Sequence, residues 1–290
     1  MSRAERLALY EVPEVQTLLR MLIEGSRIEL SPEIHSVIGA RYPKVEEVAG
    51  DPQKAKALLV KLAQAGILRP KFYEKIVACP RCGSKNLTFR YCCVHCQSHE
   101  IEKRADYRQV SIWFQCRSCG KRFDAPEGKH YCRACNSEFG VKESILDDAY
   151  SYVLDKGAET EFAREVLFLT PIKKILKDAG YELEASSVVR GASGASHSFD
   201  LVGSKTQENQ EEIITLDIEI SDKLCGEERV ISVFAKKFDV SPTKSILIAI
   251  PALSETAKKL ANLYELEIVE GAKPEEIAQG FRESLGKIFC

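Results

Sequence analysis

The sequence predicts an α+β protein of several domains, with a helical amino-terminal segment, a cysteine-rich middle and an α/β carboxyl-terminal domain. Nine of the eleven cysteines lie between Cys79 and Cys135 of the 290-residue chain. The formal charge also changes along the chain, from +2 over residues 1–75 and +3 over 76–150 to −7 over 151–290. Helical patterns precede the cysteines, and alternating strand and helix patterns follow them.

The overall composition argues against a membrane or secreted protein. The net charge is −2, 29% of the residues are charged, and no run approaches the ~18 apolar residues that a membrane span needs. The first residues include Glu5, Glu11 and Glu14 and have no apolar signal-peptide core. We therefore expect a cytoplasmic protein with no membrane partner. No glycine-rich phosphate loop or Ser/His/Asp order is present, so no small-molecule substrate is predicted.

Residues 1–75 predict a helical, winged-helix-like segment. Apolar residues recur at helical spacing over 13–24, and Ser31-Pro32 is expected to start a short helix. Asp51-Pro52 is a good N-cap and first-turn pair, and Gly66 supplies the stop of that helix. A strand is expected to lead from there to the first cysteine. Because this helix carries no basic cluster, we expect little DNA binding at this segment.

The middle segment, residues 76–142, predicts tandem four-cysteine zinc ribbons. Two residues between cysteines let both thiolates bind one ion in a tight turn, and two such turns complete a tetrahedral site. Gly or Asn follows three of the turns and readily adopts the positive φ required there. Zinc is favoured over disulfides, which are rare in cytosolic proteins, and over an iron–sulfur cluster, which four thiolates can also hold. The pairs are Cys79/Cys82, Cys93/Cys96, Cys116/Cys119 and Cys132/Cys135.

The pairing of these four turns into two zinc sites is open. The simplest pairing is sequential, with the first two turns binding one ion and the last two turns binding the other. Ten and twelve residues then separate the inner cysteines, and both spacings suit a β-hairpin. An interleaved pairing is the alternative. Cys92 is expected to be a spare cysteine, and His95, His99 and His130 are expected to be surface or supporting residues.

The ribbons are a candidate nucleic-acid surface. Residues 76–135 carry 11 lysines and arginines against 5 acidic residues, and seven aromatic residues are interleaved with them. Basic charge attracts phosphate, and aromatic rings stack on bases. We expect Lys121, Arg122 and Trp113 to contact RNA or DNA. In the alternative interpretation the basic residues only neutralise the thiolates and the aromatic residues fill a small core.

The cysteine-rich run resembles the thaumarchaeal output domain over about residues 76–150. The resemblance rests on the CPRCGS opening at 79–84, the CQSHEIEK stretch at 96–103 and the YCRACNSEF ending at 131–139. That family consists of archaeal zinc-ribbon arrays attached to sensory or regulatory modules. The family has a further turn-bearing stretch that this chain lacks, which leaves the zinc pairing open. The resemblance implies an archaeal regulatory protein.

Residues 143–156 are expected to form a connecting helix, and 157–290 an α/β domain. The predicted order is α-β-β-β-α-β-α-β-α, with three meandering strands followed by right-handed crossovers to parallel strands. Helices are expected before the first strand, after the third and fourth strands, and at the end. The expected strands lie at 183–189, 199–203, 213–221, 245–251 and 266–270.

This order resembles the restriction-endonuclease-like fold of the PD-(D/E)xK type. The resemblance implies Mg²⁺ binding by Asp200 in SFDLVG and by Glu219 in LDIEIS, with Glu165 as a third carboxylate in some members. Ser221 stands where the family has its catalytic lysine. Helical spacing indicates Lys237 as the substitute for that lysine, because Lys237 lies near the buried face of its helix.

Three functions are compatible with the sequence. The favoured one is a non-catalytic archaeal zinc-ribbon adaptor or regulatory protein that binds RNA, the ribosome or DNA. Its degenerate nuclease-like domain would then serve homodimerisation or protein contact. The second is a Mg²⁺-dependent nuclease that uses Asp200, Glu219 and Lys237. The third is an output module that binds only proteins. Ser221 disfavours the nuclease, and the basic, aromatic ribbons disfavour the third reading.

Overall fold

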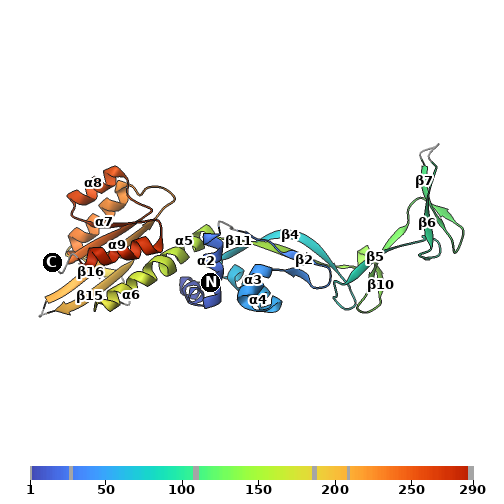
Figure 1. Ribbon diagram of the computed structural model, residues 1–290, viewed down its shortest axis with the longest axis horizontal. Helices are drawn as coiled ribbons and strands as arrows, with labels where there is room; N and C mark the ends of the chain where they lie inside the picture. Colours follow the sequence, from blue (N-terminus) through green and yellow to red (C-terminus); the bar gives the residue numbers. More distant parts are fainter. Residues whose placement is uncertain (1, 26–28, 107–110, 185–187, 208–209, 287–290) are drawn as a thin grey trace. The chain divides into compact units, whose positions relative to one another are not determined.

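The structure is a computed structural model that describes residues 2–25, 29–106, 111–184, 188–207 and 210–286. It divides into two compact units, Met1–Asp155 and Lys156–Cys290 (Figure 1). Helices and strands occur in both units, so the predicted α+β multidomain class is confirmed. None of the described helices is long and apolar enough to cross a membrane.

The first unit opens with a layer of short helices. The α2 helix buries Val15, Leu18 and Leu22. The α4 helix begins as predicted, because the Asp51 carboxylate accepts hydrogen bonds of 2.8 Å from the N–H groups of Gln53 and Lys54. The helices are α1 (Arg3–Tyr10), α2 (Pro13–Glu24), α3 (Pro43–Ala49) and α4 (Pro52–Gln64).

The helix predicted after Ser31-Pro32 is wrong. The chain there forms a short antiparallel hairpin of β2 (Glu33–His35) and β3 (Gly39–Arg41). Gly39, which adopts a φ of 82°, begins the second strand. A residue in that left-handed conformation interrupts a helix, so the local sequence favours the turn.

The first unit also contains a three-stranded antiparallel sheet in the order β1-β11-β4. Its strands are β1 (Glu29–Leu30), β4 (Leu68–Ala78) and β11 (Ile145–Leu154). The connecting helix predicted over 143–156 is wrong, because most of that segment is β11. The residues of β4 that pair with β11 lie 67 to 86 positions earlier, from Ile145↔Ala78 to Leu154↔Leu68. The local sequence pattern of residues 143–156 therefore cannot reveal this pairing.

The cysteine-rich segment is inserted between β4 and β11 and forms two small sheets, here called the inner and outer ribbons. The inner ribbon has the strand order β10-β9-β5, and the outer ribbon has the order β6-β7-β8. A 3-10 turn at Val141–Glu143 connects the inner ribbon to β11. The strands are β5 (Leu87–Cys92), β6 (Ile101–Asp106), β7 (Ser111–Cys116), β8 (Arg122–Phe123), β9 (Glu127–Cys132) and β10 (Glu138–Gly140).

The second unit is built on a five-stranded sheet in the order β12-β15-β16-β17-β18. The first three strands are antiparallel and the last three are parallel, as the predicted order requires. The strands are β12 (Glu182–Leu183), β15 (Leu201–Gln207), β16 (Gln210–Ile220), β17 (Lys244–Ile250) and β18 (Glu267–Glu270). The helices are α5 (Lys156–Phe162), the π-helix Ala163–Leu169, α6 (Thr170–Asp178), α7 (Glu227–Val240), α8 (Glu255–Leu263) and α9 (Pro274–Gly286).

Beside this sheet lies a separate hairpin of β13 (Val188–Arg190) and β14 (Ser196–Ser198). The strand predicted over 183–189 is divided between β12 and β13, and residues 185–187 lie outside the described part of the chain. The two ends of the predicted strand therefore pair with different partners.

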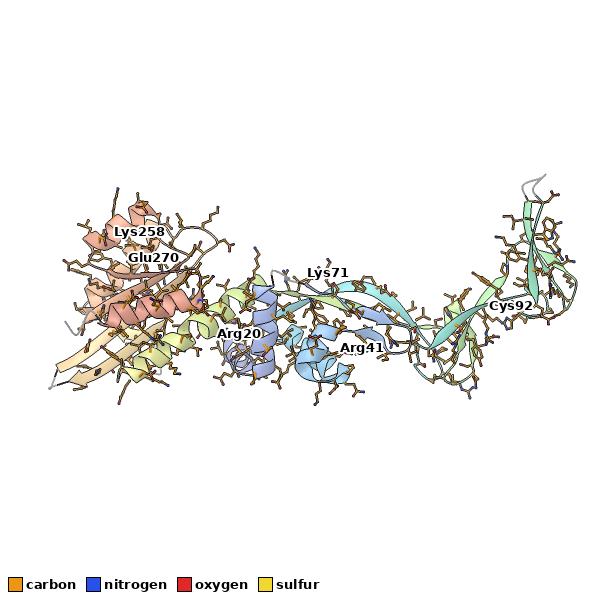
Figure 2. All side chains as sticks on the ribbon, viewed as in Figure 1. Arg20, Arg41, Lys71, Cys92, Lys258 and Glu270 are labelled. Atoms are coloured by element: carbon orange, nitrogen blue, oxygen red, sulfur yellow. The ribbon has the colours of Figure 1, made fainter. Side chains whose placement is uncertain are left out.

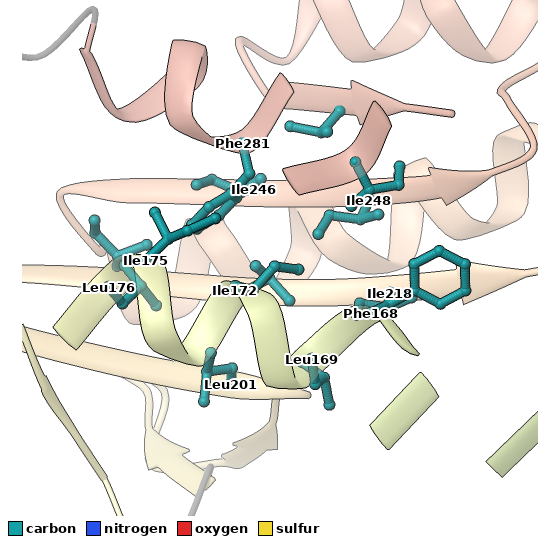
Figure 3. Close-up of a cluster of buried hydrophobic side chains, with 14 of the residues drawn as sticks. Phe168, Leu169, Ile172, Ile175, Leu176, Leu201, Ile218, Ile246, Ile248 and Phe281 are labelled. Atoms are coloured by element: carbon teal, nitrogen blue, oxygen red, sulfur yellow. The ribbon is translucent and has the colours of Figure 1, made fainter. Parts of the chain in front are cut away.

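The core of the second unit occupies both faces of its sheet. Alternation along β17 turns Ile246 and Ile248 toward α6 and α9 (Figure 3), and Ile250 belongs to the same cluster. Leu247 and Ala249 pack against α7 and α8. The same alternation in β16 buries Ile214, Leu216 and Ile218 with α6. It therefore turns the intervening side chains of β16, Asp217 among them, toward the α7 side.

Candidate metal centres and charged cluster

The structure brings all eight paired cysteines into two groups. Within each group the sulfur atoms lie within 4.8 Å of one another. Each group joins two of the four cysteine turns. The inner group consists of Cys79, Cys82, Cys132 and Cys135, and the outer group of Cys93, Cys96, Cys116 and Cys119.

The sequential pairing is therefore wrong, because the two groups are nested. The reason is the register of the inner ribbon, in which β5 pairs with β9 so that Leu87 lies opposite Cys132 and Cys92 opposite Glu127. The first turn thus meets the fourth. The second turn meets the third because β6 pairs with β7 so that Ile101 lies opposite Cys116. Loop lengths alone do not distinguish these arrangements, since each suits a hairpin.

The backbone of all four turns is the same. In each one the N–H of the first cysteine donates to the carbonyl oxygen of the residue five positions later, at 2.9–3.0 Å. The residue four positions after the first cysteine has a positive φ of 71° at Gly83, 73° at Gly120 and 56° at Asn136, as predicted. In the remaining turn, which contains Cys93 and Cys96, Gln97 occupies this position with a φ of 62°, although glutamine seldom adopts this conformation.

The geometry of the sulfur atoms suits one tetrahedral ion per group. Zinc–sulfur bonds of ~2.3 Å place the sulfurs of a tetrahedron roughly 3.8 Å apart. Two Sγ–Sγ separations in the inner group are 3.7 and 3.6 Å, and two in the outer group are 3.8 and 3.6 Å. A four-iron cluster fills more space and would hold its cysteine sulfurs farther apart. Each group could therefore hold one zinc ion.

The thiols of one group do not ionise equally. The backbone N–H of Cys119 leads the interactions that lower the pKa of Cys116 to about 6. In the same group the N–H of Ser98 favours the Cys96 thiolate, but desolvation and the neighbouring sulfurs outweigh it and raise its pKa to about 12. Four thiolates at these distances need a compensating dication, which is what zinc supplies.

Cys92 lies where the two ribbons meet (Figure 2). It is buried outside both groups, and its thiol donates to Gln97 Oε1 at 3.4 Å and to the Glu127 carbonyl at 3.6 Å. Gln97 Nε2 donates to Glu127 Oε2 at 2.9 Å, and Lys129 Nζ donates to Gln97 Oε1 at 2.5 Å. These side-chain bonds of Gln97 explain why a glutamine occupies the strained turn position. They tie the outer ribbon to β9.

The predicted nucleic-acid residues lie on the outer ribbon. The guanidinium of Arg122 lies over the Trp113 ring, 4.1 Å from its centroid. Trp113 is half-buried, and Lys121 and Arg122 are exposed. Arg122 and Trp113 therefore form one cationic and aromatic surface, with Lys121 beside it in sequence.

In the second unit, three carboxylates converge on the α7 side of the sheet. Asp217 and Glu219 alternate with buried residues of β16 and share a face. Asp200 precedes β15 and is held beside them, because the Ile218 N–H donates to Asp200 Oδ2 at 2.7 Å. Asp217 is only 2% exposed, and burial raises the pKa of its carboxyl even though Lys236 and Arg229 oppose the rise.

Three cations face these carboxylates. Arg229 contacts all of them, with Nη2 3.1 Å from Asp217 Oδ1, Nε 3.3 Å from Glu219 Oε2 and Nη2 3.9 Å from Asp200 Oδ2. Lys236 Nζ lies 2.7 Å from Asp217 Oδ1, and Arg164 Nη1 lies 3.2 Å from Asp200 Oδ1. The cluster therefore combines three negative with three positive groups.

The prediction that Lys237 replaces the catalytic lysine is wrong. Lys237 Nζ donates to the carbonyls of Tyr264 and Glu265, at the end of α8. Lys236 reaches the carboxylates instead, because it lies seven residues after Arg229 on the same edge of α7. This i, i+7 pair was the signal in the sequence that could have found both cations. Ser221 lies at the turn after β16, where its Oγ accepts a bond from the Lys223 N–H.

The donor set does not fit the predicted magnesium site. Asp200 and Glu219 both lie within 4 Å of Arg229, whose positive charge competes with a metal ion for their oxygens. Glu165, the expected third carboxylate, lies 3.9 Å from Lys173, whereas its neighbour Arg164 reaches Asp200. Asp217 Oδ2 is buried without a hydrogen-bond partner in the described part of the chain. A cation could reach that oxygen only beside Arg229 and Lys236.

Asp239 fixes the β13–β14 hairpin beside this cluster. Its carboxylate accepts hydrogen bonds of 2.6 Å from Ser193 Oγ and 2.7 Å from the Ser193 N–H, and lies 2.6 Å from His197 Nε2. These contacts, led by Ser193, lower the pKa of Asp239 to about 2. Glycine is required at Gly191, because a Cβ there would lie 2.0 Å from Asp239 Oδ2.

A family model described as thaumarchaeal output domain 1 matches residues 7–106. The match covers the helical segment, β4, β5 and β6, and therefore begins and ends earlier than the resemblance over 76–150. The CPRCGS and CQSHEIEK stretches lie within it, and the YCRACNSEF ending lies outside it. No curated protein matches the chain.

Solved structures give only weak similarities. A protein of unknown function, AF1548, is 20% identical, with a TM-score of 0.31 over 41% of this chain and 67% of its own. Can2 from Sulfobacillus thermosulfidooxidans, solved with cyclic tetra-adenylate, is 12% identical, with a TM-score of 0.33 over 54% of this chain and 42% of its own. EndoMS in its apo form is 13% identical, with a TM-score of 0.24 over 75% of this chain and 93% of its own. Scores of this size say nothing about what this chain does.

The nested grouping predicts which cysteine substitutions act on the same ion. Cys82→Ser combined with Cys135→Ser should remove one metal ion per chain, because both residues belong to the inner group. Cys82→Ser combined with Cys96→Ser should remove both ions, because these residues belong to different groups. Elemental analysis of the two purified double variants measures this directly. The opposite result for Cys82 and Cys96, loss of a single ion, would restore the sequential pairing.

Proposed function

We propose that this chain is a non-catalytic zinc-ribbon protein of a regulatory system that binds nucleic acid through residues 76–135. In this proposal each cysteine group holds one structural zinc ion, and the second unit serves dimerisation or protein contact. The observation that carries the proposal is the pair of nested four-sulfur groups that hold a basic, aromatic surface. The match to an archaeal output-domain model over residues 7–106 supports a regulatory role.

The charge of the ribbons supports contact with nucleic acid. Residues 76–135 have a formal charge of +6 before metal is counted. Four thiolates around a zinc ion carry about −2, so two sites leave the ribbons at about +2. The stacked Arg122 and Trp113 side chains offer both a cation and a ring to a polynucleotide. RNA, ribosomal RNA and DNA share this chemistry.

Removing the two positive charges of Lys121 and Arg122 should weaken binding. We expect Lys121→Ala/Arg122→Ala to lower affinity for single-stranded RNA at low salt. The slope of log affinity against log salt should become shallower by ~0.7 for each lost phosphate contact. Fluorescence anisotropy with a labelled oligonucleotide over a salt series measures both quantities.

The matched control is Lys44→Ala/Lys61→Ala, which removes two exposed charges from α3 and α4. This control should leave affinity and slope unchanged. Equal losses in both double variants would show that binding depends on the overall charge of the chain and not on the ribbon surface. Wild-type affinity that does not change with salt would refute electrostatic binding by the ribbons.

The charged cluster of the second unit supports a non-catalytic role. Metal-dependent hydrolysis of a phosphodiester needs carboxylates free to bind the cation and a base or cation that orients water. Here Arg229 lies against all three carboxylates, and Lys237 is engaged at the end of α8. The cluster therefore supports a structural role, in which it fixes α7 to the sheet.

We expect no metal-dependent cleavage by the wild-type protein. Labelled single- and double-stranded DNA and RNA are incubated with Mg²⁺ or Mn²⁺ and resolved on denaturing gels. Asp200→Ala and Glu219→Ala serve as controls for contaminating nucleases, which they would leave unaffected. Cleavage that both substitutions abolish would establish the nuclease instead. Further loss in Lys236→Ala but not in Lys237→Ala would then identify the lysine.

The second unit carries an exposed apolar patch that supports homodimerisation. Ile231, Phe234 and Phe238 lie at i, i+3 and i+7 on α7, and Phe238 is 77% exposed. Leu263 at the end of α8 is 75% exposed, and the neighbouring Tyr264 ring stacks on Phe234 at 3.9 Å. Two copies of the chain would bury these side chains against each other.

A charge in this patch should therefore separate the dimer. We expect Phe238→Glu to sediment as a monomer at concentrations at which the wild-type protein is dimeric. Val188→Glu, at a half-exposed position of β13 outside the patch, should sediment like the wild-type protein. A wild-type protein that is monomeric at high concentration would remove the proposed dimer.

A further inference from the structure

A cleft with a volume of about 820 Å³ lies between the two ribbons. Arg90 and Tyr91 of β5 line it on the inner ribbon, and Lys103 of β6 and Phe114 of β7 line it on the outer ribbon. His99, Ile101 and Pro126 complete the lining. Ligand pockets commonly have volumes of ~300–1,000 Å³, so this space can admit one or two nucleotide units.

The cleft is lined by one face of the outer ribbon. Lys103 lies opposite Phe114 across the β6–β7 ladder, and residues paired in this way project on the same face of the hairpin. Trp113 and Arg122 project on the other face, so the cleft is separate from the surface predicted from the sequence.

His99 fixes the joint between the two ribbons. Its Nδ1 donates to the Tyr91 carbonyl at 2.9 Å, and its Nε2 lies 3.1 Å from Glu138 Oε1. Together with the Gln97 contacts, these bonds hold the two walls of the cleft in one arrangement.

The aromatic wall of the cleft is accessible. Tyr91 is 56% exposed, and its ring meets the edge of Phe89 at 5.2 Å. Phe89 lies over Gly128, where a Cβ would come within 2.2 Å of the Phe89 ring, so the glycine lets the aromatic pair lie against β9. Phe114 and Ile101 supply a half-buried apolar floor. A planar, apolar group can therefore stack in the cleft.

Two cations border this apolar surface. Lys103 is exposed and has no ion-pair partner among the described residues. Arg90 lies over the Tyr131 ring at 3.6 Å, and its Nη1 is 3.7 Å from Glu138 Oε1. Glu138 is the one carboxylate that contacts this rim in the described part of the chain, and it contacts Arg90 and His99. Lys103 is thus left to bind an anion.

We propose that this cleft binds single-stranded nucleic acid, with a base against Tyr91 and Phe114 and a backbone phosphate at Lys103. The proposal rests on the proposed nucleic-acid function of the ribbons and assigns that function to a defined site. An exposed ring, an apolar floor and an adjacent free cation are the combination that single strands require, whereas a duplex hides its base faces. RNA, DNA and free mononucleotides share this chemistry.

The test uses the full-length, zinc-loaded protein and ten-nucleotide RNA and DNA strands that carry one 2-aminopurine. We expect quenching of the probe on binding, because stacking on a ring quenches its fluorescence. Tyr91→Ala should weaken binding about 5- to 150-fold, the range measured for loss of one base–aromatic stack, and Tyr91→Phe should restore it. Lys103→Ala should lower the salt slope by ~0.7. AMP competition distinguishes a free nucleotide from a strand as the ligand.

The controls are Tyr73→Ala and Lys71→Ala, which change the same residue types at exposed positions of β4 outside the cleft. They should bind like the wild-type protein, and all variants should retain the wild-type zinc content. If wild-type protein binds and the Tyr91 and Lys103 variants bind equally well, the cleft is not the site, although the ribbons still bind nucleic acid. If the wild-type protein binds none of the strands, both the proposed nucleic-acid function and the proposed site in the cleft are wrong.

Discussion

The nesting of the two cysteine groups is the constraint on which the first unit depends. The inner group joins Cys79 and Cys82 to Cys132 and Cys135, and it closes a loop that contains the entire outer ribbon. That loop is itself inserted between β4 and β11, which are paired along ten residues of β11. The β4–β11 pairing therefore brings the two ends of the inner ribbon together, and the inner cysteine group brings the two ends of the outer ribbon together. Each of these contacts shortens the loop that the next one has to close, which lowers the entropic cost of closing it.

This arrangement also explains how small ribbons hold a fixed surface. The core of the inner ribbon consists of Cys79, Cys132 and Phe139, and the core of the outer ribbon consists of Cys93, Cys116 and Phe123. Such cores bury too little apolar area to stabilise a fold alone, so the sulfur groups must supply the cross-links. The side chains at the joint, Gln97 and His99, then decide how the ribbons meet, and the cleft follows from their contacts.

The second unit illustrates how a charged cluster in a buried place is held by its own ion pairs. Asp217 lies in the middle of the sheet, where an unpaired carboxylate would be costly. Arg229 and Lys236 project from one edge of α7, and both contact Asp217 Oδ1. These two ion pairs offset the cost of burying the Asp217 carboxylate. Arg229 also contacts Asp200 and Glu219, which favours a structural role for the cluster over hydrolysis.

The sequence by itself determined the features that depend on neighbouring residues. The cysteine spacing, the positive φ at Gly83, Gly120 and Asn136, the Asp51 cap of α4 and the strand order of the second unit all follow from local pattern and turn chemistry. Only the tertiary structure decided the features that depend on distant partners. The nested pairing follows from the β5–β9 register, β11 exists because β4 lies beside it, and Lys236 rather than Lys237 faces Asp217 because of how α7 lies against the sheet. Spacing constrains where a chain can turn, but the partner that a strand or side chain meets is set by packing across tens of residues.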